Sequence, residues 1–154
     1  GVINCYEIAS ASKRIDAIVF GIFDLLNDMQ IEYTKGNPVG GKYSRYKVPV
    51  AAAAAGIPAI DGIWQEIKDK KGLEQDCKLG KELGYSGKSI IHPAQIEITH
   101  RVFNPNSSEI TWSKLVVKEY EKSTKKGRGA IVIDGKMIDE VHYKRAKALL
   151  ELSK

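Results

Sequence analysis

Three acidic residues and one histidine stand where their side chains could do chemistry. Asp24, Asp61 and His92 each follow a short apolar run, and Asp139 follows a turn near the C-terminus. A carboxylate can hold a hard cation such as Mg²⁺ through its oxygens, and it can also move a proton as a general acid or base. These residue types therefore raise two chemistries, metal binding and proton transfer.

Each of these residues also has a structural interpretation. Asp24 could instead cap the helix that follows it, and a cap or turn role is the simpler interpretation of Asp61. Asp139 by itself has the character of a surface carboxylate. Pro93 forces His92 toward extended backbone, and no second His, Cys or acidic residue lies at metal-ligand spacing. We therefore interpret His92 as a residue that shapes its loop.

The apolar runs alternate with amphipathic stretches, which is the pattern of βα units around a parallel sheet. The predicted strands are 17–21, 58–60 and 88–91, and the predicted helices are 42–55, 72–84 and 94–104. Gly56 and Gly84 end two of these helices, and Pro49 should kink the first helix or mark its first turn. A turn-rich loop, 33–42, precedes that helix. Because ligands bind at the carboxyl ends of parallel strands, Asp24, Asp61 and His92 are well placed for a site.

The last third of the chain predicts a different local structure. Asn106 and Glu109 form a capping pair ahead of a helix with periodic apolar residues. Asp134-Gly135 is a strong signal for a two-residue turn between the apolar runs 130–133 and 137–138. A final amphipathic helix is expected over 141–152.

The composition is that of a compact soluble domain, because 43% of the 154 residues are apolar and 28% are charged. No run approaches the ~20 apolar residues of a membrane helix, so we expect no membrane partner. The net charge of +5 is unevenly spread: residues 1–110 hold 13 basic against 13 acidic residues, and residues 111–154 hold 11 against 6. Arginine and aromatic residues are sparse in that basic part, which favours a solvated helix surface over a nucleic-acid face. The GxSxG and GxxxxGK[ST] patterns are absent, which argues against a serine hydrolase and a P-loop.

Five ordered segments give the chain a family resemblance. They are Gly1-Val2-Ile3-Asn4 with Glu7-Ile8-Ala9, Val19-Phe20-Gly21-x-x-Asp24-Leu25, Gly56-Ile57-Pro58-Ala59-Ile60-Asp61, the run from Leu83 through Gly87-Lys88 to Ile91-His92-Pro93-Ala94-Gln95, and Asp134-Gly135-Lys136-Met137-Ile138-Asp139. With these segments the sequence resembles the C-terminal half of the citrate lyase β-subunit and malyl-CoA lyase family, which are Mg²⁺-dependent carbon–carbon lyases. The pairing of GKxxIHPxQ with DGKMID is the most specific part of the match.

The resemblance implies an α/β fold: about three parallel strands from the C-terminal part of a (β/α)₈ TIM-type barrel in 1–104, and a helical extension or lid in 105–154. It implies that Asp24 holds Mg²⁺ together with a glutamate expected just before Gly1. Asp139 is implied as the acid or base, on a lid that closes over a neighbouring subunit of a homo-oligomer. Contacts with substrate or CoA are implied for Gly21, Ser89, Ile90, His92, Pro93 and Gln95.

The activity implied is cleavage of a malyl-, citramalyl- or citryl-type CoA thioester to a 2-oxo acid and an acyl-CoA, in the cytoplasm or, in a eukaryote, the mitochondrial matrix. Phe23 stands where many relatives carry glutamate, so a CoA-binding relative without catalysis is a second interpretation. A basic nucleic-acid-binding module is a third. The chain opens on Gly1 without Met, so we expect it to be a piece of a longer chain and to have little or no activity alone.

Overall fold

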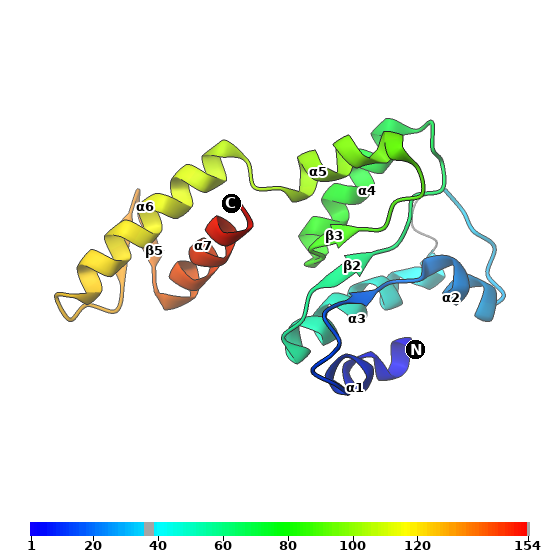
Figure 1. The fold of residues 1–154 in the computed structure, drawn as a ribbon, viewed down its shortest axis with the longest axis horizontal. Helices are drawn as coiled ribbons and strands as arrows, with labels where there is room; N and C mark the ends of the chain where they lie inside the picture. The colour runs from blue at the N-terminus through cyan, green and yellow to red at the C-terminus, as the bar shows by residue number, and fades with distance from the viewer. Residues whose placement is uncertain (36–38, 154) are drawn as a thin grey trace. The chain divides into compact units, whose positions relative to one another are not determined.

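The structure, a computed structural model, describes residues 1–35 and 39–153 and divides the chain into two compact units (Figure 1). Unit 1 is Gly1–Phe103, and unit 2 begins at Asn104. The centre of the predicted loop 33–42, Gly36-Asn37-Pro38, lies outside the described residues. Among the described residues, none of the helices has the length and hydrophobicity of a membrane-spanning segment.

Unit 1 contains a three-stranded parallel sheet in the order β1-β2-β3. Its strands are β1 (Ile18–Val19), β2 (Ala59–Asp61) and β3 (Gly87–Lys88). Its helices are η1 (Val2–Asn4), α1 (Cys5–Ser10), α2 (Ile22–Asp28), α3 (Val39–Ala55), α4 (Lys70–Leu83), η2 (Pro93–Gln95) and α5 (Ile96–Phe103) (Figure 1). The alternation of parallel strands with helices confirms the predicted α/β arrangement.

β1 and β3 are shorter than predicted, and β2 keeps the predicted length but is shifted by one residue, so that it includes Asp61. β1 is an edge strand of this sheet, and Val19 is 62% exposed although the run 17–21 is apolar. β3 ends at Lys88 instead of Ile91, because the Ser89 N–H donates the last bond of the ladder to the Asp61 carbonyl. Beyond that bond the chain leaves the sheet, and Ile91 is exposed.

The three predicted helices of unit 1 differ from their predicted limits, and the helix expected over 94–104 is divided into η2 and α5. α3 begins at Val39, three residues earlier than expected, and Pro49 lies inside the helix and not in its first turn. α4 begins at Lys70 because the Asp69 side chain accepts a hydrogen bond from the Gly72 N–H as its N-cap. Its predicted end is confirmed: Gly84 adopts φ +97°, the left-handed conformation typical of a glycine that ends a helix.

The helices of unit 1 bury two apolar clusters. One lies between the sheet and the helices and contains Phe20, Ile22, Leu26, Val48, Ala52, Ala59 and Tyr85. The other contains Trp64, Leu73, Cys77 and Ile98. Together they fix the ends of the strands, where the candidate site lies.

Unit 2 consists of α6 (Ser107–Thr124), the antiparallel strands β4 (Ile131–Ile133) and β5 (Lys136–Ile138), and α7 (Glu140–Leu152). The predicted capping box of Asn106 and Glu109 is present. Asp134 and Gly135 both have positive φ, which is the two-residue hairpin turn that the sequence predicts. The core of this unit is Val116, Tyr120, Ile133, Ile138 and Ala146.

Candidate functional site

Asp24 lies in the first turn of α2, just beyond the carboxyl end of β1. Gly21 is the N-cap of α2, so the alternative that Asp24 caps this helix is wrong. A Cβ atom on Gly21 would lie 3.1 Å from Asp24 Oδ2, which is tighter than an ordinary van der Waals contact. Glycine at position 21 therefore lets the exposed carboxylate lie close over the end of the strand.

The Asp24 carboxylate lines a cavity of about 470 Å³ in unit 1. Asp28, one turn further along α2, lines the same cavity. The walls are mostly apolar and include Val2, Ile8, Ile18, Val19 and Leu25. An apolar cavity with a few oriented polar groups is the usual form of a small-molecule site.

Mg²⁺ commonly binds through one or two carboxylates and takes its remaining ligands from water or substrate. Asp24 fits that requirement as a single exposed carboxylate with open space in front of it. Among the described residues, no three His, Cys, Asp or Glu side chains come together as a closed metal site. The geometry suits an ion that one protein carboxylate binds and whose other ligands are water or substrate atoms.

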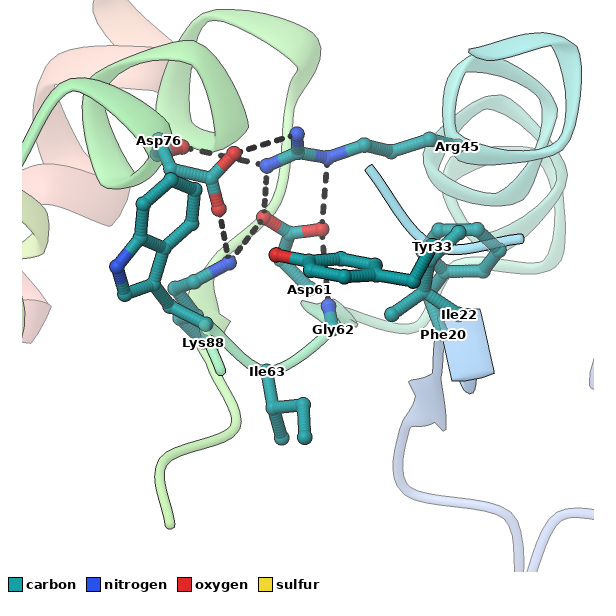
Figure 2. A pocket seen from close by; sticks show the side chains of 10 residues that line it. Phe20, Ile22, Tyr33, Arg45, Asp61, Gly62, Ile63, Asp76 and Lys88 are labelled. Atoms are coloured by element: carbon teal, nitrogen blue, oxygen red, sulfur yellow. Dashed lines mark hydrogen bonds and ion pairs between the residues drawn. The ribbon is translucent and has the colours of Figure 1, made fainter. Parts of the chain in front are cut away.

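Asp61 has a different role from either one predicted. It is the last residue of β2, is 1% exposed, and lies in a buried cluster of four charges with Arg45, Asp76 and Lys88 (Figure 2). Arg45 Nε donates to Asp61 Oδ1 at 3.0 Å, and a second Arg45 nitrogen donates to Oδ2. Lys88 Nζ lies 3.0 Å from Asp61 Oδ2 and 2.5 Å from Asp76 Oδ2. We call these four residues the charge cluster.

The charge cluster joins β2 and β3 to the helices α3 and α4, and its two cations balance its two carboxylates. Burial alone lowers the pKa of Arg45, but the hydrogen bond and charge of Asp61 and the charge of Asp76 outweigh it, so the pKa is raised above its ordinary value. The pocket beside the cluster, lined also by Tyr33 and Ile63, has about 20 Å³ of free space, which is room for about one water molecule (Figure 2). A thioester substrate cannot enter there, so the cluster is structural.

The side chain of Gln95, which is 1% exposed, fixes the loop after β3 through hydrogen bonds to the backbone. Gln95 Oε1 accepts a hydrogen bond from the Ile91 N–H at 3.0 Å, and its Nε2 donates to the Trp64 carbonyl at 2.9 Å. These bonds tie the loop after β3 to the loop after β2. The Gln95 side chain therefore points into the protein. Only the exposed residues of the loop can contact a ligand.

His92 Nδ1 accepts a hydrogen bond from the Ala94 N–H at 3.1 Å, as the N-cap of η2, and Pro93 opens that short helix. This is the loop-shaping role predicted for His92. Ser89 gives its backbone N–H to the sheet, and Ile90 is 38% exposed.

Asp139 belongs to unit 2, where it is the N-cap of α7. Its Oδ1 accepts hydrogen bonds from the N–H groups of Val141 and His142 at 3.0 and 3.3 Å and lies 2.7 Å from His142 Nδ1. The side-chain bond to His142 comes first, and the backbone bonds add to it, in lowering the pKa of Asp139 below its usual range. The carboxylate is consequently ionised at neutral pH.

Arg45 and Asp76 are two members of the charge cluster that the sequence pattern did not predict. The signal that could have found them is a charge on the buried face of an amphipathic helix. Arg45 lies three residues before buried Val48 on α3, and Asp76 lies next to Cys77, which is fully buried on α4. A charge in such a position needs a buried partner, and Asp61 is the carboxylate that β2 supplies.

Comparison with known proteins places this chain in a family. The sequence profile of the HpcH/HpaI aldolase/citrate lyase family matches residues 1–93. A (3S)-malyl-CoA thioesterase of Cereibacter sphaeroides is 33% identical over 150 residues, which are 97% of this chain and 52% of that protein. A citrate lyase subunit beta of Leuconostoc mesenteroides is 35% identical over 154 residues, 99% of this chain and 50% of that protein. The chain thus spans about half the length of these curated relatives.

Solved structures share the fold. The protein CitE of Mycobacterium tuberculosis, in complex with magnesium, acetoacetate and coenzyme A, superposes with a TM-score of 0.78 at 23% identity, over 99% of this chain and 57% of that one. RipC of Yersinia pestis superposes with a TM-score of 0.66 at 31% identity, over 71% of this chain and 50% of that one. The family profile, the similarity to curated relatives along almost all of this chain and the shared fold agree, and the chain belongs to the HpcH/HpaI aldolase/citrate lyase family.

Proposed function

We propose that this chain carries part of the active site of a Mg²⁺-dependent carbon–carbon lyase that cleaves a malyl-, citramalyl- or citryl-type CoA thioester to a 2-oxo acid and an acyl-CoA. The observation that carries the proposal is the Asp24 carboxylate, lying over Gly21 at the carboxyl end of β1 and facing a mostly apolar cavity. Family membership supports the reaction class. Because the relatives are about twice as long, the activity is proposed for the complete gene product that carries this chain.

In this proposal the sheet of unit 1 belongs to a (β/α)₈ barrel spanning 1–104 and beyond, and 105–154 is an extension that closes over the neighbouring subunit of a homo-oligomer. The more exposed part of the loop after β3, with Ser89, Ile90, His92 and Pro93, contacts the substrate or its CoA portion together with Gly21, and buried Gln95 supports that loop from inside the protein. The hydrogen bonds that Gln95 makes to the Ile91 and Trp64 backbone support this role, because they fix the loop before a ligand arrives.

Asp24 would hold Mg²⁺, which when bound supplies Lewis-acid polarisation of the oxygens of the 2-oxo acid unit. Cleavage breaks the bond between the hydroxyl-bearing carbon and the carbon next to the thioester carbonyl. The hydroxyl proton is lost, and the second carbon gains one. Asp139 would donate the proton to that second carbon in cleavage and accept it in condensation. Its ionised form at neutral pH can accept that proton in the condensation direction, and in cleavage its protonated form must donate the proton.

A thioesterase is the second candidate, because the Cereibacter sphaeroides relatives carry that name. Hydrolysis would add water across the C–S bond of malyl-CoA and release malate and free CoA thiol. The lyase reaction leaves the thioester intact and releases glyoxylate and acetyl-CoA. The two reactions therefore differ in whether a thiol or a 2-oxo acid appears.

A relative without catalysis was suggested by Phe23. The Phe23 ring lies 4.8 Å from the Tyr33 ring, centroid to centroid, and packs against the core of unit 1. Packing thus accounts for Phe23 without loss of the Asp24 carboxylate, which favours the catalytic proposal.

The test is a product assay on the complete gene product with malyl-CoA, trapping 2-oxo acid as a hydrazone and titrating thiol in parallel. We expect hydrazone without thiol, and turnover lowered by about 10²- to 10⁴-fold in Asp139→Asn, because asparagine keeps the helix cap but cannot move the proton. Thiol release without hydrazone would establish the thioesterase instead. Neither product from malyl-, citramalyl- or citryl-CoA, together with no Mg²⁺-dependent binding of glyoxylate, pyruvate or oxaloacetate, would establish the relative without catalysis.

A further inference from the structure

Unit 2 has a line of lysines along α6. Lys114, Lys118, Lys122 and Lys125 are spaced by four, four and three residues, which places them on one side of a helix. All four are exposed. From the first to the last, the line extends about 16 Å along the helix axis.

These lysines line a groove of about 420 Å³ between α6 and the C-terminal part of α7. Val117 and Leu150, both half-buried, also line it. We call the four lysines with Val117 and Leu150 the lysine groove. The remaining lining residue, Glu121, accepts a hydrogen bond from the Tyr143 hydroxyl at 2.8 Å.

Outside the groove, the described lysines of unit 2 other than Lys126 each contact a carboxylate or an aromatic ring. Lys144 pairs with Glu140 at 2.8 Å, and Lys136 and Lys147 lie over the rings of Trp112 and Tyr143. In the groove, Lys122 lies 3.9 Å from Glu119, at the limit of an ion pair. Among the described residues, no ion pair or ring contact is found for Lys114, Lys118 or Lys125.

Helix electrostatics account for only part of this arrangement. Lys122 and Lys125 lie at the C-terminal end of α6, where cations complement the helix dipole. Lys114 and Lys118 lie in the middle of the helix, where that effect has faded. Four neighbouring ammonium groups repel one another, and an anion that spans several of them would relieve that repulsion.

We propose that the lysine groove binds a polyphosphate group, carried by a nucleotide or present as inorganic polyphosphate. A single phosphate would reach only part of a 16 Å line, about 11 residues of helix, whereas a chain of phosphates follows it. Nucleic acid is disfavoured, because the groove offers no arginine fork and no aromatic ring for a base to stack on. The groove shares no residue with the cavity at Asp24 and does not include Asp139. Binding to the groove can therefore be measured without an assay of turnover.

The experiment is calorimetric titration of the 154-residue chain with inorganic tripolyphosphate, ADP and CoA at two salt concentrations. The test variant is Lys114→Gln/Lys118→Gln/Lys125→Gln. The matched control is Lys136→Gln/Lys144→Gln/Lys147→Gln, which removes the same charge from the same unit. Circular dichroism checks that both variants stay folded.

We expect tripolyphosphate affinity to fall at least about tenfold in the test variant and to stay within about twofold in the control, with a salt slope that reports no more than about four contacts. A higher affinity for ADP or CoA than for tripolyphosphate, lost in the test variant, identifies a nucleotide as the source, and the reverse order identifies inorganic polyphosphate. Equal losses in both variants would show nonspecific attraction and overturn the proposal, as would absence of binding. Tighter binding of a DNA or RNA duplex, lost in the same test variant, would overturn it in favour of nucleic acid.

Discussion

At the scale of single residues, Asp24 and Asp61 show how one sequence pattern can place two carboxylates in opposite environments. Both follow an apolar run, but Asp61 is still within β2, where Arg45 of α3 and Lys88 of β3 bind its carboxylate. Asp24 comes after the strand has ended and stays exposed over Gly21. The pattern predicted both as candidates for metal binding, and only Asp24 remains one.

The charge cluster should be sensitive to the loss of one charge. Asp61→Asn leaves Arg45 and Lys88 with only one carboxylate in a buried site, so we expect the free energy of unfolding to fall by about 3 kcal/mol or more. Urea denaturation measures this change. Asp16→Asn, at an exposed position, is the matched control and should change stability by less than about 0.5 kcal/mol. A similar small effect for both variants would mean that the cluster is not buried as described.

The ionisation of Asp139 depends on its neighbour. The carboxylate has a pKa below its ordinary value, with the side-chain hydrogen bond to His142 as the first cause. Its contribution to stability is therefore present at neutral pH and is lost only as the pH falls through that lowered pKa. We expect His142→Ala to move the pKa upward toward its ordinary value, as measured by NMR titration of the Asp139 carboxyl carbon. An unchanged pKa would show that the helix cap alone sets it.

At the scale of elements, the sequence predicted helix ends better than strand ends. Gly84 and the Asn106–Glu109 capping box act locally, so their effect can be read from a few residues. Strand ends depend on where a partner strand stops pairing, and the apolar run that ends at Ile91 outlasts the ladder by three residues. The charge cluster also depends on contacts between distant parts of the chain. It was not predicted because its members come from four separate elements.

The hairpin of unit 2 gives a test at this scale. Gly135 has φ +73° in the turn, so Gly135→Ala should destabilise unit 2 by about 1 to 2 kcal/mol. The unfolding of unit 2 is followed by the fluorescence of Trp112. For this purpose Trp64 is replaced by Phe in the parent and in each variant. Gly129→Ala is the control, since Gly129 has no positive φ and open space around its Cβ position. Equal effects of the two substitutions would contradict the turn assignment.

At the scale of the whole molecule, the chain is two compact units, each with a core of its own. We expect this independence to appear in hydrogen exchange. Asp61→Asn should speed exchange of slow amides in 1–103 by about a hundredfold, as a loss of about 3 kcal/mol requires, while amides from 104 onward stay within about twofold of the parent. Faster exchange throughout the chain would show that the units unfold together.

The central claim is that Asp24 is the carboxylate through which this protein binds Mg²⁺ and, with it, a 2-oxo acid. The most direct test is calorimetric titration of the complete gene product with glyoxylate, with and without Mg²⁺, for the parent, Asp24→Asn and Asp28→Asn. Asp28 lines the same cavity one turn along α2, so its variant removes an equal charge nearby. We predict that Asp24→Asn weakens Mg²⁺-dependent binding by at least about tenfold, while Asp28→Asn stays within about twofold. Unchanged binding in Asp24→Asn would contradict the account.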